Sequence, residues 1–154
     1  MTTVIGVDPG VSGALACIID GELLDVVDMP TAGGIVSAIG VCEVLREFQL
    51  AGMDDVPIVV VEKVGAMPGN GVSSMFKFGR SLGVIEGAVA GRGFPLRWVT
   101  PQVWKGSRGL LRQDKDVARL LALELWPAHS ATFARCKDVG RADAALIAAW
   151  GAGL

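Results

Sequence analysis

The sequence predicts one α/β domain built on a mixed sheet of five strands with helices on its faces. Two observations predict this class: the chain opens with three short β-prone runs separated by tight turns, and later strands alternate with segments of helical periodicity. The length of 154 residues suits one domain, residues 1–154, and no internal repeat or linker divides it. With 51% hydrophobic residues the composition is that of a densely packed globule, which excludes a disordered chain.

The first three strands are expected to form an antiparallel meander. Residues 2–7 are apolar and β-prone and end at the turn Asp8-Pro9-Gly10, after which residues 13–19 resume as a second strand. The dipeptide Asp20-Gly21 is typical of a hairpin turn, and it leads into a third strand at residues 22–28.

The remaining elements are two more strands and four helices. Apolar residues recur at near-helical spacing over residues 35–49, which predicts a helix. Residues 58–61 are apolar without polar alternation, which is typical of a central strand covered on both faces. After a loop rich in glycine and proline, the predicted elements are a helix over 72–90, a strand over 94–99 and helices over 114–126 and 143–150.

The predicted helix over residues 72–90 carries an unusual pattern of glycines. Gly79, Gly83, Gly87 and Gly91 recur every four residues, and each glycine inside a helix costs about 1 kcal/mol relative to alanine. A stripe of glycines lets another backbone approach closely. This face is therefore expected to pack against the sheet or against a second copy of the chain, with a broken helix as the alternative.

Three carboxylates are attached to elements that should be buried. Asp8 ends the first strand, Glu62 ends the run 58–61, and Asp143 opens the last helix. A carboxylate beside a core is costly unless it is paired or bound to a cation. If the first and fourth strands are neighbours, the three side chains form a set of oxygen ligands for Mg²⁺ or Mn²⁺. Taken singly, Asp8 is also a common turn residue and Asp143 a favourable charge in a first helical turn.

The charges are distributed unevenly along the chain. Residues 1–76 contain two basic and ten acidic residues, whereas residues 77–154 contain twelve basic and six acidic ones. An acidic, cation-binding half beside a basic, polyanion-binding half suits enzymes that act on phosphodiesters, despite the net charge of -2. A solvated basic helix surface is the alternative interpretation.

Other sequence features limit the cellular setting. No apolar run approaches the roughly 18–20 residues that a membrane span needs, and the N-terminus lacks the pattern of a secretory signal. Three cysteines without CxxC spacing predict reduced, mostly buried thiols rather than a zinc site. A cytoplasmic protein is expected, in a bacterial host cell if the gene is carried by a phage.

Five segments, spread in order over nearly the whole chain, form a recognisable set. They are Val4-Ile5-Gly6-Val7-Asp8-Pro9-Gly10 with Ser12-Gly13, Val59-Val60-Val61-Glu62, Gly79-Arg80-Ser81-Leu82-Gly83-Val84-Ile85-Glu86-Gly87, Thr100-Pro101-Gln102-Val103-Trp104-Lys105, and Arg141-Ala142-Asp143-Ala144-Ala145-Leu146. Together they resemble the RuvC-type Holliday junction resolvases of the RNase H-like fold, in particular their small phage members. The resemblance implies Mg²⁺-dependent nicking of four-way junctions and other branched DNA, including forks and flaps, by a homodimer.

The resemblance also implies roles for individual residues. Asp8, Glu62 and Asp143 match the family's metal ligands, and they would hold two Mg²⁺ ions, with Mn²⁺ as a substitute. One ion would lower the pKa of the attacking water and the other would stabilise the departing 3'-oxygen. Lys105 and Lys115 fall where the family keeps lysines close to the scissile phosphate. The candidate contacts to the DNA backbone are Arg80, Arg92, Lys105, Arg108, Arg112, Lys115 and Arg119.

The sequence departs from the family at two positions. Bacterial members have an aspartate three residues before the one matched by Asp143, where this chain has Gly140, so Asp138 is assigned as the fourth ligand. Bacterial members also place an aromatic residue three positions after the strand-ending glutamate, where this chain has Gly65. Met67 and Phe76 are the candidate replacements, although the expected place of Phe76 is the core.

Three other functions are weighed against the nuclease. The first is a structure-selective protein that binds branched DNA with weak or no nuclease activity, which the glycine at position 140 favours. The second is an actin-like phosphotransferase, because residues 8–13 resemble the first phosphate-binding turn of that superfamily, but no second copy of the turn is present. The third is a related nuclease that acts on RNA or replication forks.

Overall fold

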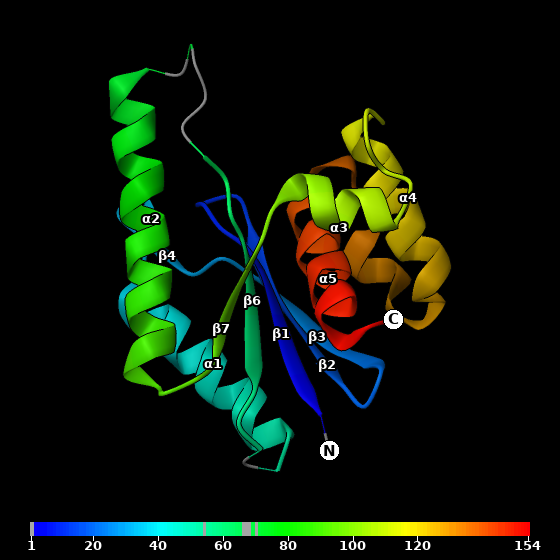
Figure 1. Cartoon of the computed structure of the whole chain (residues 1–154), viewed down its shortest axis with the longest axis horizontal. Coiled ribbons are helices and arrows are strands. Elements are labelled where there is room, and N and C mark those ends of the chain that lie inside the picture. Colours follow the sequence, from blue (N-terminus) through cyan, green and yellow to red (C-terminus); the bar gives the residue numbers. More distant parts are fainter. Residues whose placement is uncertain (1, 54, 66–68, 70) are drawn as a thin grey trace.

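The computed structural model describes residues 2–53, 55–65, 69 and 71–154. A five-stranded sheet in the order β3-β2-β1-β6-β7 forms its centre (Figure 1). The first three strands are antiparallel neighbours, and β6 and β7 add to β1 in parallel. The predicted mixed sheet and its opening meander are therefore confirmed. The strands are β1 (Thr3–Asp8), β2 (Ala14–Ile19), β3 (Glu22–Asp28), β6 (Ile58–Glu62) and β7 (Leu96–Val99).

Helices cover both faces of this sheet, as Figure 1 shows. Side chains alternate between the faces of a strand, so Ile5 and Val7 of β1 face one core while Val4 faces the other. The first core contains residues of α1 and α2, and the second contains residues of α3, α4 and α5. These helices are α1 (Ala38–Ala51), α2 (Val72–Gly91), α3 (Pro101–Ser107), α4 (Lys115–Leu125) and α5 (Val139–Ala152).

Two contacts of β1 determine where the acidic residues lie. Val7 of β1 is in register with Val61 of the parallel strand β6, so the next residue of each strand, Asp8 and Glu62, lies at the same edge of the sheet. On the other side of β1, a Cβ added to Gly6 would lie 2.3 Å from the carbonyl oxygen of Ala144. The absence of a side chain at Gly6 therefore allows α5 to approach β1 closely, next to Asp143.

Several elements differ from the sequence prediction. The last helix begins at Val139, so Asp143 lies in its second turn and is not a residue of the first turn. The first helix begins after Ser37, whose Oγ accepts a hydrogen bond from the Gly40 backbone N–H at 3.2 Å. Helix α3 was not predicted, because seven residues are too few to show a helical period. The other additions are β4 (Thr31–Ala32), β5 (Ile35–Val36), and the 3₁₀ helices η1 (Pro127–Phe133) and η2 (Cys136–Asp138).

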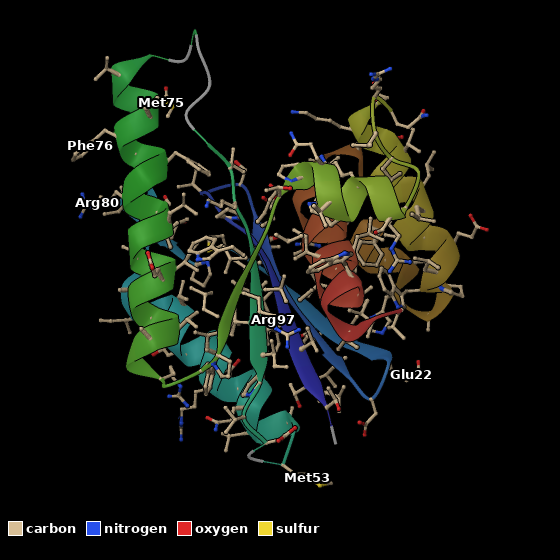
Figure 2. The ribbon with its side chains drawn as sticks, in the orientation of Figure 1. Glu22, Met53, Met75, Phe76, Arg80 and Arg97 are labelled. Carbon is tan, nitrogen blue, oxygen red and sulfur yellow. The ribbon has the colours of Figure 1, made fainter. Side chains whose placement is uncertain are left out.

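The glycine-striped helix α2 is continuous, which excludes the broken-helix alternative. A Cβ added at any of the four glycines would have no atom of another described element within 4 Å, so the stripe does not pack against the sheet. Phe76 points away from the body of the molecule (Figure 2) and is 72% exposed, so its expected core position is wrong. Met67, the other candidate for a junction-probing side chain, lies outside the described residues.

The structure also bears on the expectations for membrane-spanning segments and for the cysteines. Among the described residues no helix is both long enough and apolar enough to cross a membrane. All three cysteines are free thiols, but only Cys17 is buried, while Cys42 is half-buried and Cys136 is exposed. The expectation of mostly buried thiols is therefore correct for Cys17 alone.

Candidate active site

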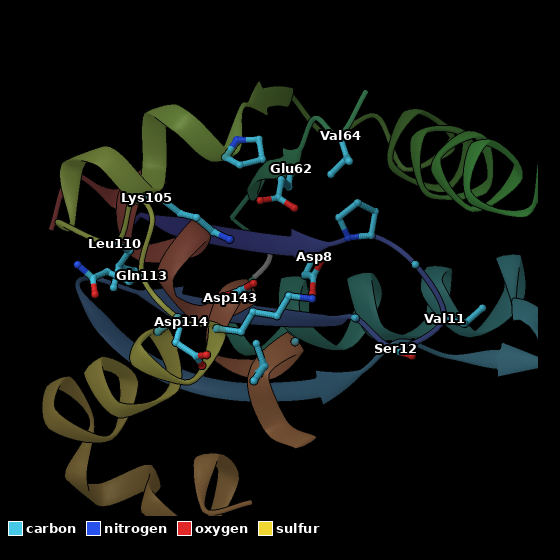
Figure 3. Close-up of a pocket in the computed structure, with 18 residues that line it drawn as sticks. Asp8, Val11, Ser12, Glu62, Val64, Lys105, Leu110, Gln113, Asp114 and Asp143 are labelled. Carbon is cyan, nitrogen blue, oxygen red and sulfur yellow. The ribbon is translucent and has the colours of Figure 1, made fainter. Parts of the chain in front are cut away.

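The three predicted carboxylates line one pocket at the carboxyl edge of β1 and β6 (Figure 3). Asp8 comes from the end of β1, Glu62 from the end of β6, and Asp143 from the second turn of α5. The pocket has a volume of about 600 Å³, and the turn between β1 and β2 forms one of its walls. Residues that are separated by up to 135 positions in the chain are thus brought together by the sheet register and by the approach of α5 to β1.

Two of these carboxylates have strongly perturbed acidities. Burial, together with repulsion from Asp143 and Glu62, raises the pKa of Asp8 well above its usual value. Burial also raises the pKa of Asp143 to about 6, and the charge of Glu62 acts in the same direction. The charges of Lys105 and Lys115 lower both pKa values but do not outweigh burial. The pocket thus has an excess of negative charge that a bound cation would neutralise.

The carboxylates fit a divalent cation through their chemistry. Oδ1 of Asp143 is buried and has no hydrogen-bond partner, which is unusual for a charged oxygen and leaves it free to act as a ligand. The acidic side chains offer only oxygen donors, which Mg²⁺ and Mn²⁺ prefer. Among the described residues, no three acidic, histidine or cysteine side chains are already arranged as a metal site. The three carboxylates therefore share a pocket without forming a complete coordination sphere.

Glu62 differs from the other two carboxylates because a neighbouring side chain holds it. The indole Nε1 of Trp104 donates a hydrogen bond to Oε1 of Glu62 at 2.8 Å. Both residues are buried, with 7% of Glu62 and none of Trp104 exposed. Trp104 lies in one of the five segments that resemble the resolvases, but the sequence did not indicate a role for it. Its position directly before Lys105 gave no indication of this contact, because Glu62 lies 42 residues earlier in the chain.

Two of the predicted basic residues reach this pocket. Lys105 of α3 and Lys115, the first residue of α4, both line it. Asp114 also lines the pocket and was missed by sequence reasoning. Its side chain caps α4 by accepting a hydrogen bond from the Asp116 backbone N–H at 2.9 Å. The residue type and its place before a helical run are the signal for such a cap, but they do not reveal the pocket.

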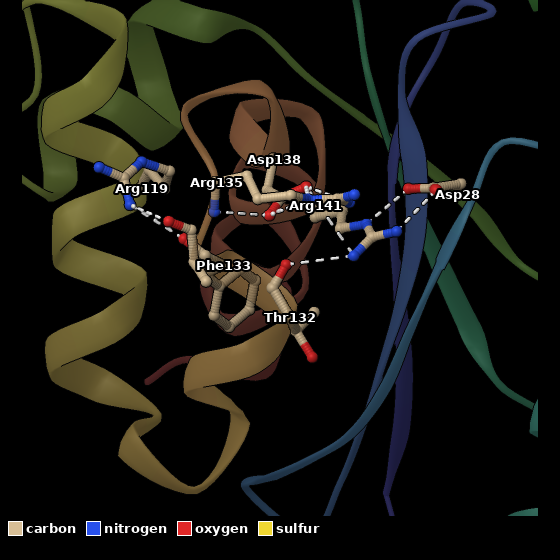
Figure 4. A network of polar contacts seen from close by, with 8 residues as sticks. Asp28, Arg119, Thr132, Phe133, Arg135, Asp138 and Arg141 are labelled. Carbon is tan, nitrogen blue, oxygen red and sulfur yellow. Dashed lines mark hydrogen bonds and ion pairs between the residues drawn. The ribbon is translucent and has the colours of Figure 1, made fainter.

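The structure does not bring Asp138, the assigned fourth ligand, into this pocket. Its carboxylate forms an ion pair with Arg135 at 2.7 Å and lies 3.9 Å from Arg141 (Figure 4). These contacts lower the pKa of Asp138, the largest cause being the side-chain hydrogen bond from Arg135. Asp138 lines a second groove, which shares Ser12 and Gly13 with the pocket of the three carboxylates. Its negative charge is paired with arginine in this structure, away from Asp8, Glu62 and Asp143.

The arginines that were predicted to contact the DNA backbone do not line this pocket. Arg119 is buried and pairs with Asp116 at 2.6 Å. It also donates a hydrogen bond to the carbonyl oxygen of Phe133 at 3.0 Å (Figure 4). It therefore cannot form part of an exposed basic face. Arg80 lies on the outward side of α2 (Figure 2), and Arg108 donates to the carbonyl oxygen of Leu154 at 2.5 Å. Arg112 is exposed, and Arg92 donates to Oε1 of Gln49 at 2.8 Å.

The fold and the pocket together define a class of protein. A mixed five-stranded sheet with an antiparallel β3-β2-β1 meander, helices on both faces and carboxylates at the carboxyl edge of β1 and β6 is the arrangement of the RNase H-like fold. No protein-family model matches the chain.

Solved structures of other proteins share the fold of this chain. RuvC of Thermus thermophilus in complex with a Holliday junction substrate superimposes with a TM-score of 0.64 at 20% identity, over 99% of this chain and 96% of that one. A second structure of Thermus thermophilus RuvC gives 0.62 at 21% identity, over the same shares of the two chains. The yeast mitochondrial Holliday junction resolvase Ydc2 gives 0.54 at 14% identity, over 96% of this chain and 76% of that one.

This chain is also similar in sequence to a chloroplastic Holliday junction resolvase, MOC1 of Chlamydomonas reinhardtii. It is 35% identical over 94 residues, which make up 60% of this chain but 11% of the algal protein. This chain thus corresponds to a small part of that protein's length. The comparisons confirm the RNase H-like fold class and the resemblance to RuvC-type resolvases.

Proposed function

We propose that this protein is a divalent-metal-dependent endonuclease that nicks four-way DNA junctions and other branched DNA. The observation that carries the proposal is the pocket in which Asp8, Glu62 and Asp143 meet with two lysines at the edge of the sheet. The fold shared with RuvC and the sequence match to a resolvase support the choice of substrate. The proposed cofactor is Mg²⁺, with two ions per site and Mn²⁺ as a substitute.

We assign different roles in phosphodiester hydrolysis to the carboxylates and to the lysines of the pocket. Asp8, Glu62 and Asp143 would hold the ions, which when bound supply a more acidic water and stabilise charge on the departing 3'-oxygen. Lys105 and Lys115, which line the same pocket, would stabilise the negative charge of the scissile phosphate. Because Asp138 is paired with arginine and position 140 is glycine, we assign three carboxylate ligands to the site.

A homodimer is the proposed assembly. A four-way junction has approximate two-fold symmetry and must be cut twice, so a two-fold dimer matches its substrate. The exposed glycine stripe of α2 supports this helix as the interface, since no described residue packs against the space beside its four glycines. Val72 and Phe76, both on α2, are 87% and 72% exposed, which adds apolar surface to the same helix. We place the protein in the cytoplasm, in keeping with the free cysteines of the described residues.

A junction-cleavage assay tests the proposal. A labelled four-way junction is incubated with the protein in Mg²⁺, in Ca²⁺ or in EDTA, and nicks are resolved on a denaturing gel. We expect nicks in Mg²⁺ alone, and a loss of at least about 100-fold in rate for Asp8→Asn, Glu62→Gln and Asp143→Asn. Glu43→Gln, which changes an exposed acid on α1, is the matched control and should retain the wild-type rate.

A second candidate function is selective binding of branched DNA without cleavage. It is favoured by the ion pair that removes Asp138 from the pocket, since this leaves one carboxylate fewer than the resembled bacterial family has. The same assay separates the two functions. Retarded junction on a native gel with no nick in Mg²⁺ or Mn²⁺ would establish the binder and refute the nuclease.

A further inference from the structure

The side chain of Trp104 contacts two residues of the candidate active site at once. The edge of its indole donates a hydrogen bond from Nε1 to Oε1 of Glu62 at 2.8 Å. The ammonium Nζ of Lys105, the next residue in the chain, lies 5.1 Å from the centroid of the same ring, within the range of a cation–π contact. One rigid side chain therefore lies between an expected metal ligand and an expected phosphate-binding lysine.

The surroundings of Trp104 keep its ring in place. The side chain is completely buried, and its apolar cluster includes Val60, Leu146 and Ile147. A buried aromatic ring enclosed by β-branched and leucine side chains has little freedom to change its rotamer. Its N–H can only donate, so it selects one oxygen of Glu62 as its acceptor and leaves the other oxygen available to the pocket.

We propose that Trp104 is a positioning residue of the active site, which orients the Glu62 carboxylate toward the bound cation and holds the Lys105 ammonium beside it. This inference rests on the proposed function. A neutral N–H satisfies one oxygen of the buried glutamate without cancelling its charge, so the charge remains available to a cation. A lysine or arginine in the same place would compete with the cation for that charge. Partners of this kind are usually important for affinity, because they fix the orientation of the ligand.

Two substitutions at position 104 isolate the hydrogen bond. Trp104→Phe retains an aromatic face but removes the N–H. Replacing Trp104 with 3-benzothienylalanine, which has sulfur in place of the N–H, removes the donor while preserving the shape of the ring and therefore the packing. Trp150→Phe is the matched control, because Trp150 packs against the same apolar cluster and does not line the pocket.

The readout is the affinity for Mn²⁺ in the absence of DNA, measured from the free-ion signal by electron paramagnetic resonance, with circular dichroism to verify folding. We expect both substitutions at position 104 to weaken Mn²⁺ binding about 10-fold, and Trp150→Phe to leave it unchanged. In a Glu62→Gln background, Trp104→Phe should cause no further loss, since it acts through Glu62.

Wild-type affinity in the benzothienylalanine protein would overturn the proposal, whether or not Trp104→Phe binds less Mn²⁺, because the loss would then come from packing. A further loss in the Glu62→Gln background would overturn it too. If the unmodified protein binds no Mn²⁺, the proposed function itself is refuted along with this inference. If it binds Mn²⁺ and the substitutions have no effect, the role of Trp104 alone is refuted.

Discussion

The backbone of Gly140 lies directly against that of Ser12. A Cβ added to Gly140 would be 2.5 Å from the Ser12 carbonyl oxygen and 3.2 Å from Oδ2 of Asp8. The turn between β1 and β2 therefore occupies the space that a side chain at position 140 would need. This contact explains in physical terms why the chain has no carboxylate there, and it makes a fourth ligand at this position incompatible with the observed turn.

The contact predicts an unusual effect of adding a methyl group. Glycine to alanine inside a helix ordinarily stabilises a protein by up to about 1 kcal/mol. For Gly140→Ala we expect the opposite, a loss of roughly 1–3 kcal/mol, because the Ser12 carbonyl must move. Urea denaturation measures the difference. Gly106→Ala in α3 is the control, since its Cβ would meet only the Leu111 side chain, at 3.5 Å. Equal stabilisation by both variants would contradict the packing described for Gly140.

The raised pKa of Asp143 predicts how stability depends on pH without metal. Burial raises this pKa from 3.8 to about 6, so the ionised side chain disfavours the folded state. The contribution of Asp143 is most favourable below its unfolded-state pKa and is lost as the pH rises through about 6. Asp143→Asn should therefore be more stable than the wild type above about pH 6, by roughly 1–3 kcal/mol, and the difference should vanish below about pH 4. Urea denaturation in EDTA from pH 4 to 8 checks this, and a difference independent of pH would refute it.

Lys115 and Arg119 should respond differently to substitution, although they lie one helical turn apart. Lys115 lines the pocket, so Lys115→Ala should weaken junction binding and reduce the slope of log affinity against log salt by about 1. Arg119 binds Asp116 and the Phe133 carbonyl oxygen, so Arg119→Ala should lower the melting temperature by several degrees. Fluorescence anisotropy across a salt series and thermal melts check the two effects. If Arg119→Ala weakened junction binding and Lys115→Ala lowered the melting temperature, the assignment of Lys115 to the DNA-binding surface would be contradicted.

The glycine stripe of α2 predicts an effect on assembly. In the isolated chain the Cβ of a leucine at position 83 would contact no described residue outside its own helix, so Gly83→Leu should fold with unchanged or slightly higher stability. In a dimer formed through the stripe, the same side chain would separate the helices. Sedimentation equilibrium should give twice the chain mass of 16.0 kDa for the wild type and the single mass for the variant. A wild-type protein that is monomeric, or a variant that remains dimeric, would remove α2 as the interface.

The elements that sequence analysis predicted correctly are those with strong local signals. The three opening strands are separated by recognisable turns, and the apolar run before Glu62 indicated a central strand. The condition for Asp8 and Glu62 to meet was that this strand neighbours the first, and the parallel pairing of β1 with β6 fulfils it. Asp143 was identified from its place in an apolar helix, even though that helix begins four residues earlier than predicted.

The surroundings of Asp138, Arg119 and Trp104 were not anticipated, because their side-chain partners are determined by the folded structure. Asp138 resembled a ligand by its spacing, but Arg135 turns back across η2 to bind it. Arg119 was counted as a surface charge, yet the folding of η1 against α4 buries it. The role of Trp104 could not be predicted because it depends on a hydrogen bond between α3 and the end of β6, 42 residues apart in the chain.

The most direct test of the active-site assignment is a crystal soaked in Mn²⁺ and measured for anomalous scattering at the manganese edge. We predict anomalous peaks in the pocket, bound by carboxylate oxygens of Asp8, Glu62 and Asp143, while Asp138 remains paired with Arg135. Peaks elsewhere on the protein, with that pocket empty at Mn²⁺ concentrations that support nicking, would contradict the account.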